Sequence, residues 1–442
     1  MTVFVRGVLT LLLISLLGTC GRAQENVDSM IRLAETIYPD DSVRVNELFL
    51  LFAYRVRRDS TAAAAFLEEI ERIATDKPDL YKRATFHLAR GRFLRQYATR
   101  EEAIAELEAA IALHEGKGTT GVLADVYYAL GDIYVRAGNL DLAIEKQQQA
   151  LALYRELDAV EGTVNALNSL GITNRKVDNL DRAAEYFRQT IDRASAAELL
   201  YQETVAVNNL AIIHKQRREF PQALELYERV VELSRAADPP DELGVGYAYN
   251  NISSAYSEMS LPDLGLEYAQ KAYAIFAKIG TAREQGAVLL GIGTNLQQQG
   301  KYAEAVSYFR QAAITARDFA NFRIGAVMGL RKSYEKLGVI DSVMHYYREE
   351  INLKAEREKK KNLETLAEME AKFQTTEKQR EIERLEYEDS LSQARITRLG
   401  WLLGLGALVL SVVGFLAYRL FHQRRRIQDQ NAVISKSLAE KE

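Results

Sequence analysis

The residues best suited to recognition chemistry are asparagines that recur at a regular distance along the chain. Asn168, Asn208 and Asn250 lie about forty residues apart, and Asn209 and Asn251 directly follow the last two. A side-chain amide both donates and accepts hydrogen bonds, so it can pair with the N–H and the C=O of an extended peptide. A series of such amides at one structural position predicts a surface that reads peptide backbone.

Two cations follow the first two of these asparagines at a spacing that keeps them on one helix face. Arg175 and Lys215 come seven residues after Asn168 and Asn208, which is about two helical turns. A cation beside an amide favours an acidic partner or a terminal carboxylate. Each asparagine could instead bond a neighbouring helix or water, but the repetition of the whole set favours binding.

Residue types that catalyse reactions or hold metals do not gather in this sequence. The five histidines are scattered along the chain: His87, His114, His214, His345 and His422. Gly291-Ile292-Gly293 looks like the start of a phosphate-binding loop, but no predicted strand precedes it and Leu296 replaces the third glycine. The sequence therefore predicts no catalytic residue, no metal site and no cofactor within this chain.

Composition narrows the class of protein further. The chain has 442 residues, of which 48% are hydrophobic and 27% charged, which is enough for a sizeable core. A formal net charge of -4 excludes a chain-wide basic surface for nucleic acid, and a single cysteine excludes an internal disulfide. Only 6 prolines, with abundant Ala, Leu, Glu and Arg, favour an all-α fold.

A repeat of about forty residues organises the middle of the chain. In each copy a small residue is followed twelve positions later by a second one. The pairs are Gly91 and Ala103, Gly131 and Ala143, Gly171 and Ala183, Ala211 and Ala223, Ser253 and Gly265, and Gly293 and Ala305, with weaker copies at Leu51 and Ala63 and at Arg331 and Val343. Large residues follow the second small position after four more, at Leu107, Phe187, Tyr227 and Phe309.

This spacing predicts antiparallel helix pairs that cross closely at the small side chains. Stacked pairs make a right-handed α-solenoid with a concave face lined by the first helix of each pair. We expect about eight pairs over residues 41–350. The pattern resembles the tetratricopeptide repeat (TPR) through Leu170-Gly171, Ala183 and Phe187, although the period exceeds the common ~34 residues. A HEAT-type array is the structural alternative at this period.

The N-terminus predicts a secretory signal. Arg6 precedes an apolar stretch, residues 7–18, that is too short to span a bilayer, and small residues follow it. We therefore assign residues 1–23 to a signal peptide and 24–40 to an N-terminal segment. Two alternatives stay open, because Cys20 could be lipidated or the segment could remain as an uncleaved anchor.

Residues 399–418 predict one transmembrane helix, since they contain no charge over the length that a spanning helix needs. Trp401 and Tyr418 lie near its ends, as interfacial aromatics do. Arginines follow the segment directly, so the positive-inside rule places residues 419–442 in the cytoplasm. After signal removal we expect a single-pass protein of the inner or cell membrane, with its solenoid periplasmic or extracellular.

A charged helical connector is expected over residues 351–398. Its apolar residues form an interrupted stripe typical of a coiled coil: Leu363, Leu366, Met369, Phe373, Ile382, Leu385, Leu391 and Ile396. Small residues then recur on one face of the membrane segment, at Gly400, Gly404, Ala407 and Ser411. Such a face lets two helices approach closely, which predicts a parallel homodimer.

A solenoid followed by these segments resembles bacterial TPR sensor histidine kinases. The resemblance rests on residues 366–373 and 382–385, the membrane helix and residues 434–442. It implies a protein or peptide ligand outside, a kinase domain that uses ATP and Mg beyond the cytoplasmic helix, and a response regulator as partner. Two alternatives remain: a helix-turn-helix DNA-binding output domain in place of the kinase, or a TPR scaffold for protein assembly.

Overall fold

The computed structural model describes residues 23–56, 59–76, 79–114 and 120–439. Every regular element within these ranges is an α-helix, which confirms the all-α prediction. The signal peptide predicted for residues 1–23 lies outside the described residues, except for Ala23, which begins the first described helix. Cys20 lies outside them as well.

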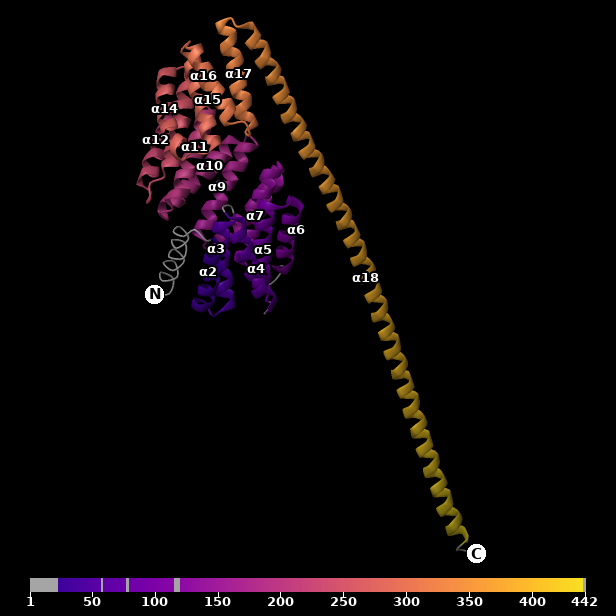
Figure 1. The fold of residues 1–442 in the computed structure, drawn as a ribbon. Helices are drawn as coiled ribbons and strands as arrows, with labels where there is room; N and C mark the ends of the chain where they lie inside the picture. Colours follow the sequence, from indigo (N-terminus) through magenta and orange to yellow (C-terminus); the bar gives the residue numbers. More distant parts are fainter. Residues whose placement is uncertain (1–22, 57–58, 77–78, 115–119, 440–442) are drawn as a thin grey trace. The chain divides into compact units, whose positions relative to one another are not determined.

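Eight helix pairs follow one another along the chain (Figure 1). The first helices of the pairs are α3 (Asp41–Arg55), α5 (Leu80–Tyr97), α7 (Thr120–Ala137), α9 (Val160–Lys176), α11 (Leu200–Gln216), α13 (Glu242–Glu258), α15 (Ala282–Gln298) and α17 (Ala320–Leu337). The second helices are α4 (Ser60–Asp76), α6 (Arg100–His114), α8 (Leu140–Glu156), α10 (Leu180–Ala196), α12 (Phe220–Ala236), α14 (Pro262–Ile279), α16 (Tyr302–Thr315) and α18 (Ile340–Ala439). A further helix, α2 (Ala23–Ile37), precedes them.

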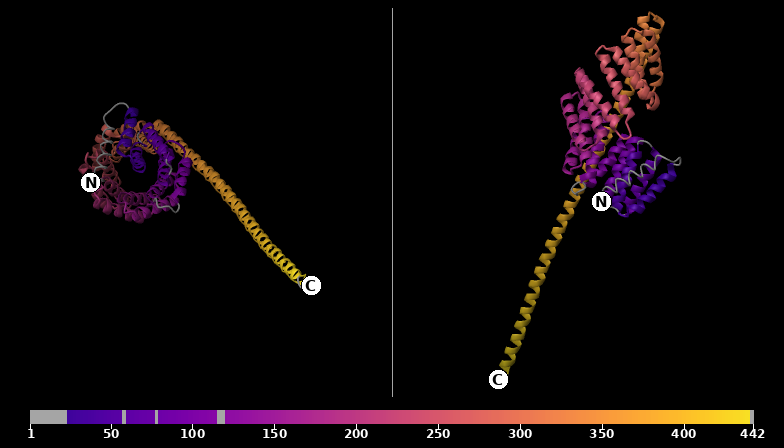
Figure 2. Two further views of the ribbon diagram at one scale, coloured as in Figure 1. Left: turned by 90° about the horizontal axis from the view of Figure 1, so that it is seen from below. Right: turned by 90° about the vertical axis from the view of Figure 1, so that its left-hand side faces the viewer.

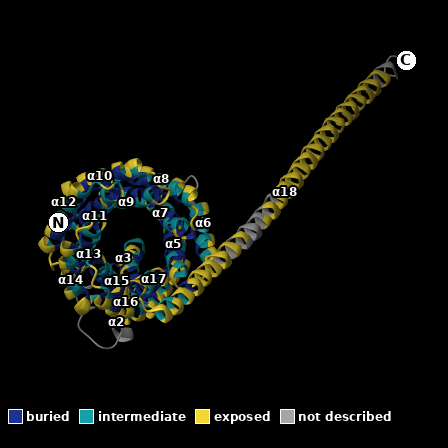
Figure 3. Cartoon of the chain, turned by 90° about the horizontal axis from the view of Figure 1, so that it is seen from above, coloured by how far each residue is buried: buried dark blue, intermediate teal, exposed yellow. Residues whose placement is uncertain are grey.

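The pairs stack side by side into two layers. Seen end-on, the odd-numbered helices α3 to α17 form the inner layer and the even-numbered helices α4 to α16 the outer layer (Figures 2 and 3). We call the surface of the odd-numbered helices that turns away from the outer layer the inner face. The structure therefore has the predicted α-solenoid architecture.

The two helices of a pair pack most closely where a small residue of one contacts a large residue of the other, as the spacing predicted. A Cβ atom added to Gly171 would lie 2.5 to 2.8 Å from ring atoms of Phe187, so a larger residue would clash there. Gly293 has the same relation to Phe309. Ala183 and Phe187 are both fully buried. Close crossing at a small residue leaves room for one large side chain from the partner helix, and this repeats along the solenoid.

Tight turns join the two helices of a pair. A residue one or two positions after the first helix adopts a left-handed conformation, as at Gly138 (φ 80°), Asp178 (φ 61°) and Gly300 (φ 78°). In one such turn the N–H of Asn179 donates to the C=O of Asn174 across 2.9 Å, which satisfies a carbonyl at the helix end.

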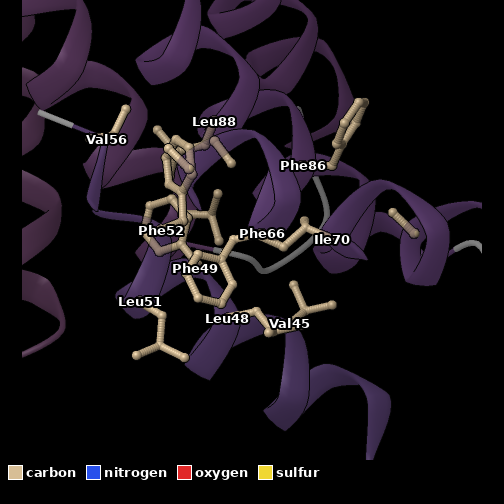
Figure 4. Close-up of a cluster of buried hydrophobic side chains, with 14 of the residues drawn as sticks. Val45, Leu48, Phe49, Leu51, Phe52, Val56, Phe66, Ile70, Phe86 and Leu88 are labelled. Atoms are coloured by element: carbon tan, nitrogen blue, oxygen red, sulfur yellow. The ribbon is translucent and has the colours of Figure 1, made fainter. Parts of the chain in front are cut away.

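The N-terminal end of the solenoid has a dense aromatic core. Phe52 and Phe66 are fully buried, and Leu48 and Leu88 pack beside them (Figure 4). The additional helix α2 contributes to the same cluster, chiefly through Met30. It covers an apolar end that stacking would otherwise leave bare.

The chain divides into two compact units, residues 1–361 and 362–442. The first turns of α18 belong to the solenoid, because Leu353 packs in one cluster with Ile324 and Val327 on α17. Residues 362–439 continue as helix, and the side chains described there are exposed. Within them, the helical segment Tyr387–Ser435 is long and apolar enough to cross a membrane, since an 18-residue window in it has a mean hydropathy of 2.2, and it contains the predicted segment 399–418.

Candidate functional site

The predicted asparagines lie on three consecutive inner helices and contact one another. Asn209 of α11 donates from Nδ2 to Oδ1 of Asn168 on α9 across 3.4 Å. Asn251 of α13 donates in the same way to Asn208 of α11 across 2.9 Å. Each bond joins an inner helix to the inner helix of the preceding pair. We call this series of side-chain contacts the amide ladder.

The ladder extends one helix further toward the N-terminus. Ser169 of α9 donates from Oγ to the hydroxyl of Tyr128 on α7 across 3.3 Å. Ser169 stands beside Asn168 as Asn209 stands beside Asn208, so it occupies the same position in its helix. The sequence interpretation missed this step, because it rested on repeated asparagines and neither serine nor tyrosine carries an amide. The signal that could have found it is the recurring separation of 41 residues between the partners.

Asn250 differs from the other predicted asparagines because it takes no part in the amide ladder. It is half-buried on α13, and its side chain forms no hydrogen bond with the part of the chain that the structure describes. Its amide is therefore open to solvent on the inner face, while its neighbour Asn251 points to α11. Of the predicted set, Asn250 alone keeps both the donor and the acceptor edge unpaired among the described residues.

Lys215 is less open than the sequence suggested. Its Nζ donates to Oγ of Ser254 across 2.9 Å and lies 3.2 Å from a carboxylate oxygen of Glu258 on α13. Only 18% of the Lys215 side chain is exposed. The charge predicted to attract an acidic partner is therefore already partnered by an acid from the next pair.

Arg175 lies deeper. Its Nε is buried without a hydrogen-bond partner, and so is the hydroxyl of Tyr227 on α12. Burial, and then the negative charge of Glu258, raise the pKa of Tyr227 although the Arg175 cation acts to lower it. These three side chains thus interact electrostatically, and two of them keep an unpaired buried polar atom.

An aromatic residue stands one turn before Asn250. Tyr247 is 43% exposed, and its ring packs edge-on against Phe276 with 5.4 Å between centroids. Its hydroxyl donates to Oε1 of Glu284 on α15 across 2.7 Å. Burial, and then this bond to a carboxylate, raise the pKa of Tyr247 to about 12. The ring is therefore neutral at physiological pH and held in one orientation beside the free amide.

Two histidines of the solenoid contact carboxylates. Nδ1 of His214 lies 2.5 Å from Glu219, and Nδ1 of His87 lies 2.7 Å from Glu106. Within residues 23–56, 59–76, 79–114 and 120–439, no three or more metal-ligating side chains gather into a group that could hold an ion. The amide ladder itself offers hydrogen bonding by neutral amides and hydroxyls.

Four small residues of the predicted membrane segment lie on one face of α18. Gly400, Gly404, Ala407 and Ser411 follow one another at spacings of four, three and four, and all are exposed. The hydroxyl of Ser411 donates to the carbonyl of Ala407 across 2.8 Å, so it needs no other partner in an apolar medium. This face is narrow and free of bulky side chains.

Comparison with known proteins agrees with the repeat assignment. A family model described as "Tetratricopeptide repeat" matches residues 122–196, 201–278 and 245–313. The solenoid is therefore TPR-like, and within residues 122–196 and 201–313 the match favours the tetratricopeptide repeat over a HEAT-type repeat. No curated protein sequence matches the chain significantly.

Solved structures resemble the solenoid at low sequence identity. The apo form of the quorum sensor NprR from B. thuringiensis is 15% identical, with a TM-score of 0.57 over 71% of this chain and 88% of that one. The apo form of RapI is 16% identical, with a TM-score of 0.55 over 71% and 98%. A signal transduction ATPase with a tetratricopeptide repeat sensor from Pyrococcus horikoshii is 13% identical, with a TM-score of 0.55 over 78% and 55%. At such identities the likeness establishes the fold.

Proposed function

We propose that the inner face of the solenoid binds an extended peptide or protein segment. The observation that carries this proposal is the row of asparagines on α9, α11 and α13, which share one position in consecutive repeats. Support comes from the fold shared with NprR, described as a quorum sensor, and with a protein that has a tetratricopeptide repeat sensor.

The geometry of stacked helices suits an extended ligand. Neighbouring helices pack about 8–10 Å apart, and an extended chain advances about 3.3 Å per residue. Each repeat would therefore meet about every third residue of a peptide that crosses the inner helices. Amides recognise the backbone at these points whatever the side chains are, so specificity would come from neighbours such as Tyr247 and Arg175.

Peptide display on phage tests this proposal directly. The full chain in detergent is used to select binders from a random peptide library, and Kd values are measured for the selected peptides. We expect the double variant Asn208→Ala with Asn250→Ala to weaken binding at least about tenfold, because each lost hydrogen bond costs about 1 kcal/mol. Gln148→Ala removes an exposed amide from outer helix α8 and should leave Kd unchanged. Equal effects of the two changes would reject the inner face as the site.

We also propose that the chain is the sensor and transmembrane region of a two-component receptor. The solenoid would lie outside the cytoplasm, residues 399–418 would cross the membrane, and residues 419–442 would lead toward a kinase domain. A membrane-impermeant thiol reagent applied to intact cells should label Asp192→Cys but not Gln430→Cys. Labelling of both positions, or of neither, would reject this topology.

The output domain separates the receptor from its alternatives. A phosphoacceptor-histidine helix and a nucleotide-binding fold encoded beyond Glu442 would support the kinase. A helix-turn-helix domain would favour a DNA-binding regulator, and a stop codon a scaffold. The sequence of the coding region decides among the three.

Dimerisation through the small-residue face is part of this proposal, since two parallel helices can pass a shift across the bilayer. Gly404→Leu should lower the dimer fraction in detergent or bilayers, because the bulky side chain separates the helices. Gly406→Leu provides the matched control, since Gly406 lies on another side of the same helix. Cross-linking yields for the two variants measure the difference, and equal yields would contradict the assigned face.

A further inference from the structure

The amide ladder has a fixed geometry along the solenoid. In each step the donor lies two positions before the small residue at which its helix pair crosses. The acceptor of this hydrogen bond lies three positions before the small crossing residue of the preceding pair. The three steps are Ser169 to Tyr128, Asn209 to Asn168, and Asn251 to Asn208, with separations of 41, 41 and 43 residues. The next step would join α15 to Asn250 on α13.

At that step the donor is replaced by glycine. Gly291 stands two positions before the crossing residue Gly293 and 41 residues after Asn250, as the pattern requires. A Cβ atom added to Gly291 would lie 4.0 Å from Oδ1 of Asn250, and apart from the adjoining residues and backbone of its own helix no other heavy atom would be as close. The side chain that should complete the ladder is missing, and open space lies where it would be.

This gap changes what Asn250 can do. An amide that bonds the next helix turns one edge inward and presents only what remains of its hydrogen-bonding capacity. Asn250 keeps its Oδ1 and Nδ2 free among the described residues, so one edge can accept from a peptide N–H and donate to a peptide C=O.

We propose that Gly291 interrupts the amide ladder to make Asn250 the anchoring point for the backbone of an extended peptide. This proposal rests on the proposed function of the inner face. It deepens that function by assigning the site to the junction of α13 and α15 rather than to the whole row of asparagines. The exposed ring of Tyr247, one turn before Asn250, supplies an apolar wall at the same junction.

One substitution tests the site at Asn250 without changing any of the asparagines on the inner helices. Gly291→Asn would place an Nδ2 within reach of Asn250 Oδ1 and complete the ladder, which removes the free edge without deleting Asn250. Gly291→Ala is the matched control, since it removes the glycine without supplying an amide and its Cβ meets nothing closer than 4.0 Å. Both variants gain helix propensity, so neither should fail to fold.

The expected result uses peptides selected by phage display on the full wild-type chain. Asn250→Ala and Gly291→Asn should each weaken Kd at least about tenfold, while Gly291→Ala changes it by less than about twofold. If Asn208→Ala weakens binding but Asn250→Ala and Gly291→Asn do not, this proposal is overturned and the inner face stands as the site. If no selected peptide responds to any inner-face variant, both are overturned.

A measurement without peptide checks the geometry itself. Gly291→Asn should raise the thermal unfolding midpoint above that of Gly291→Ala, and this extra gain should vanish when Asn250 is replaced by Ala. An extra gain that persists without Asn250, or no extra gain at all, would show that position 291 does not complete the ladder. Either result would overturn the proposal even if peptides bind.

Discussion

Two parts of helix α18 contain the same kinds of residue in opposite surroundings. Leu353 is 8% exposed and packs on Ile324 and Val327 of α17. Ten residues later Leu363 is 57% exposed, and Leu366 is 62% exposed. The first leucine belongs to the solenoid and the others to residues 362–442, which form a unit of their own.

The solenoid and residues 362–442 therefore differ in the source of their stability. In the solenoid, every pair buries its apolar side chains against the next pair, so the chain supplies its own core. In residues 362–442 the described apolar residues have no such neighbour, and Phe415 is 64% exposed. Apolar surface on this scale is typical of a helix that lies in a bilayer or against a second helix.

Replacing a phenylalanine in each part should give the largest contrast. Phe187→Ala empties a fully buried site and should lower the free energy of unfolding of the solenoid by about 3–5 kcal/mol. Phe415→Ala should leave the same quantity unchanged, because its ring is exposed. Denaturant titration in detergent, followed by circular dichroism, measures both. Similar losses would remove the distinction between the two parts.

An arginine placed in the exposed part of α18 tests whether that part lies in a membrane. Leu408→Arg should disfavour membrane integration by about 2.5–3.5 kcal/mol, the cost of arginine near the centre of a spanning helix. Leu366→Arg, outside residues 399–418, should have little effect. The fraction of each variant that resists extraction by alkaline carbonate is the measurement. A membrane-integrated Leu408→Arg variant at the wild-type level would argue against the assigned span.

The packed start of α18 should depend on pH through Glu350. Burial alone would raise the pKa of this carboxyl, but hydrogen bonds from Lys354 and Arg331 outweigh it and hold the pKa below its usual value. The resulting stability is complete above the usual pKa of about 4.3 and is lost as the pH falls through the lower folded value.

Glu350→Gln should therefore destabilise the solenoid at pH 7 by about 1–3 kcal/mol, since two charged donors lose their acceptor. The difference from wild type should begin to shrink as the pH falls below about 4.3, where the carboxyl of the unfolded chain is protonated, and should vanish once the folded carboxyl is protonated as well. Thermal unfolding at several pH values measures it. A difference that does not vary with pH would show that packing, rather than charge, is responsible.

The turns of the solenoid offer a smaller, stabilising change. Arg218 adopts a left-handed conformation with φ 61°, which costs a residue with a Cβ about 1 kcal/mol. Arg218→Gly should raise the free energy of unfolding by about that amount. Arg188→Gly, in the middle of α10, should lower it by a similar amount. The same sign for both variants would contradict the assigned turn geometry.

Much of the fold could be predicted because each helix crossing requires small and large residues at fixed spacings in the sequence. Gly171, Ala183 and Phe187 identify a close helix crossing, and their recurrence identifies the array. The same row of asparagines could be found in this way, since they share one repeat position. Their hydrogen-bond partners could not, because the spacing of one residue type does not show which side chains of the next pair face it.

The sequence by itself determined the helix pairs, their period and the apolar segment near the C-terminus, because these follow from local spacing and hydropathy. Only the tertiary structure decided that Asn209 bonds Asn168, that Lys215 is neutralised by Glu258, and that Asn250 faces a glycine. These contacts join residues about forty positions apart in different repeats. Their formation depends on how successive pairs are rotated against each other, which is a property of the stacked array and not of any one repeat.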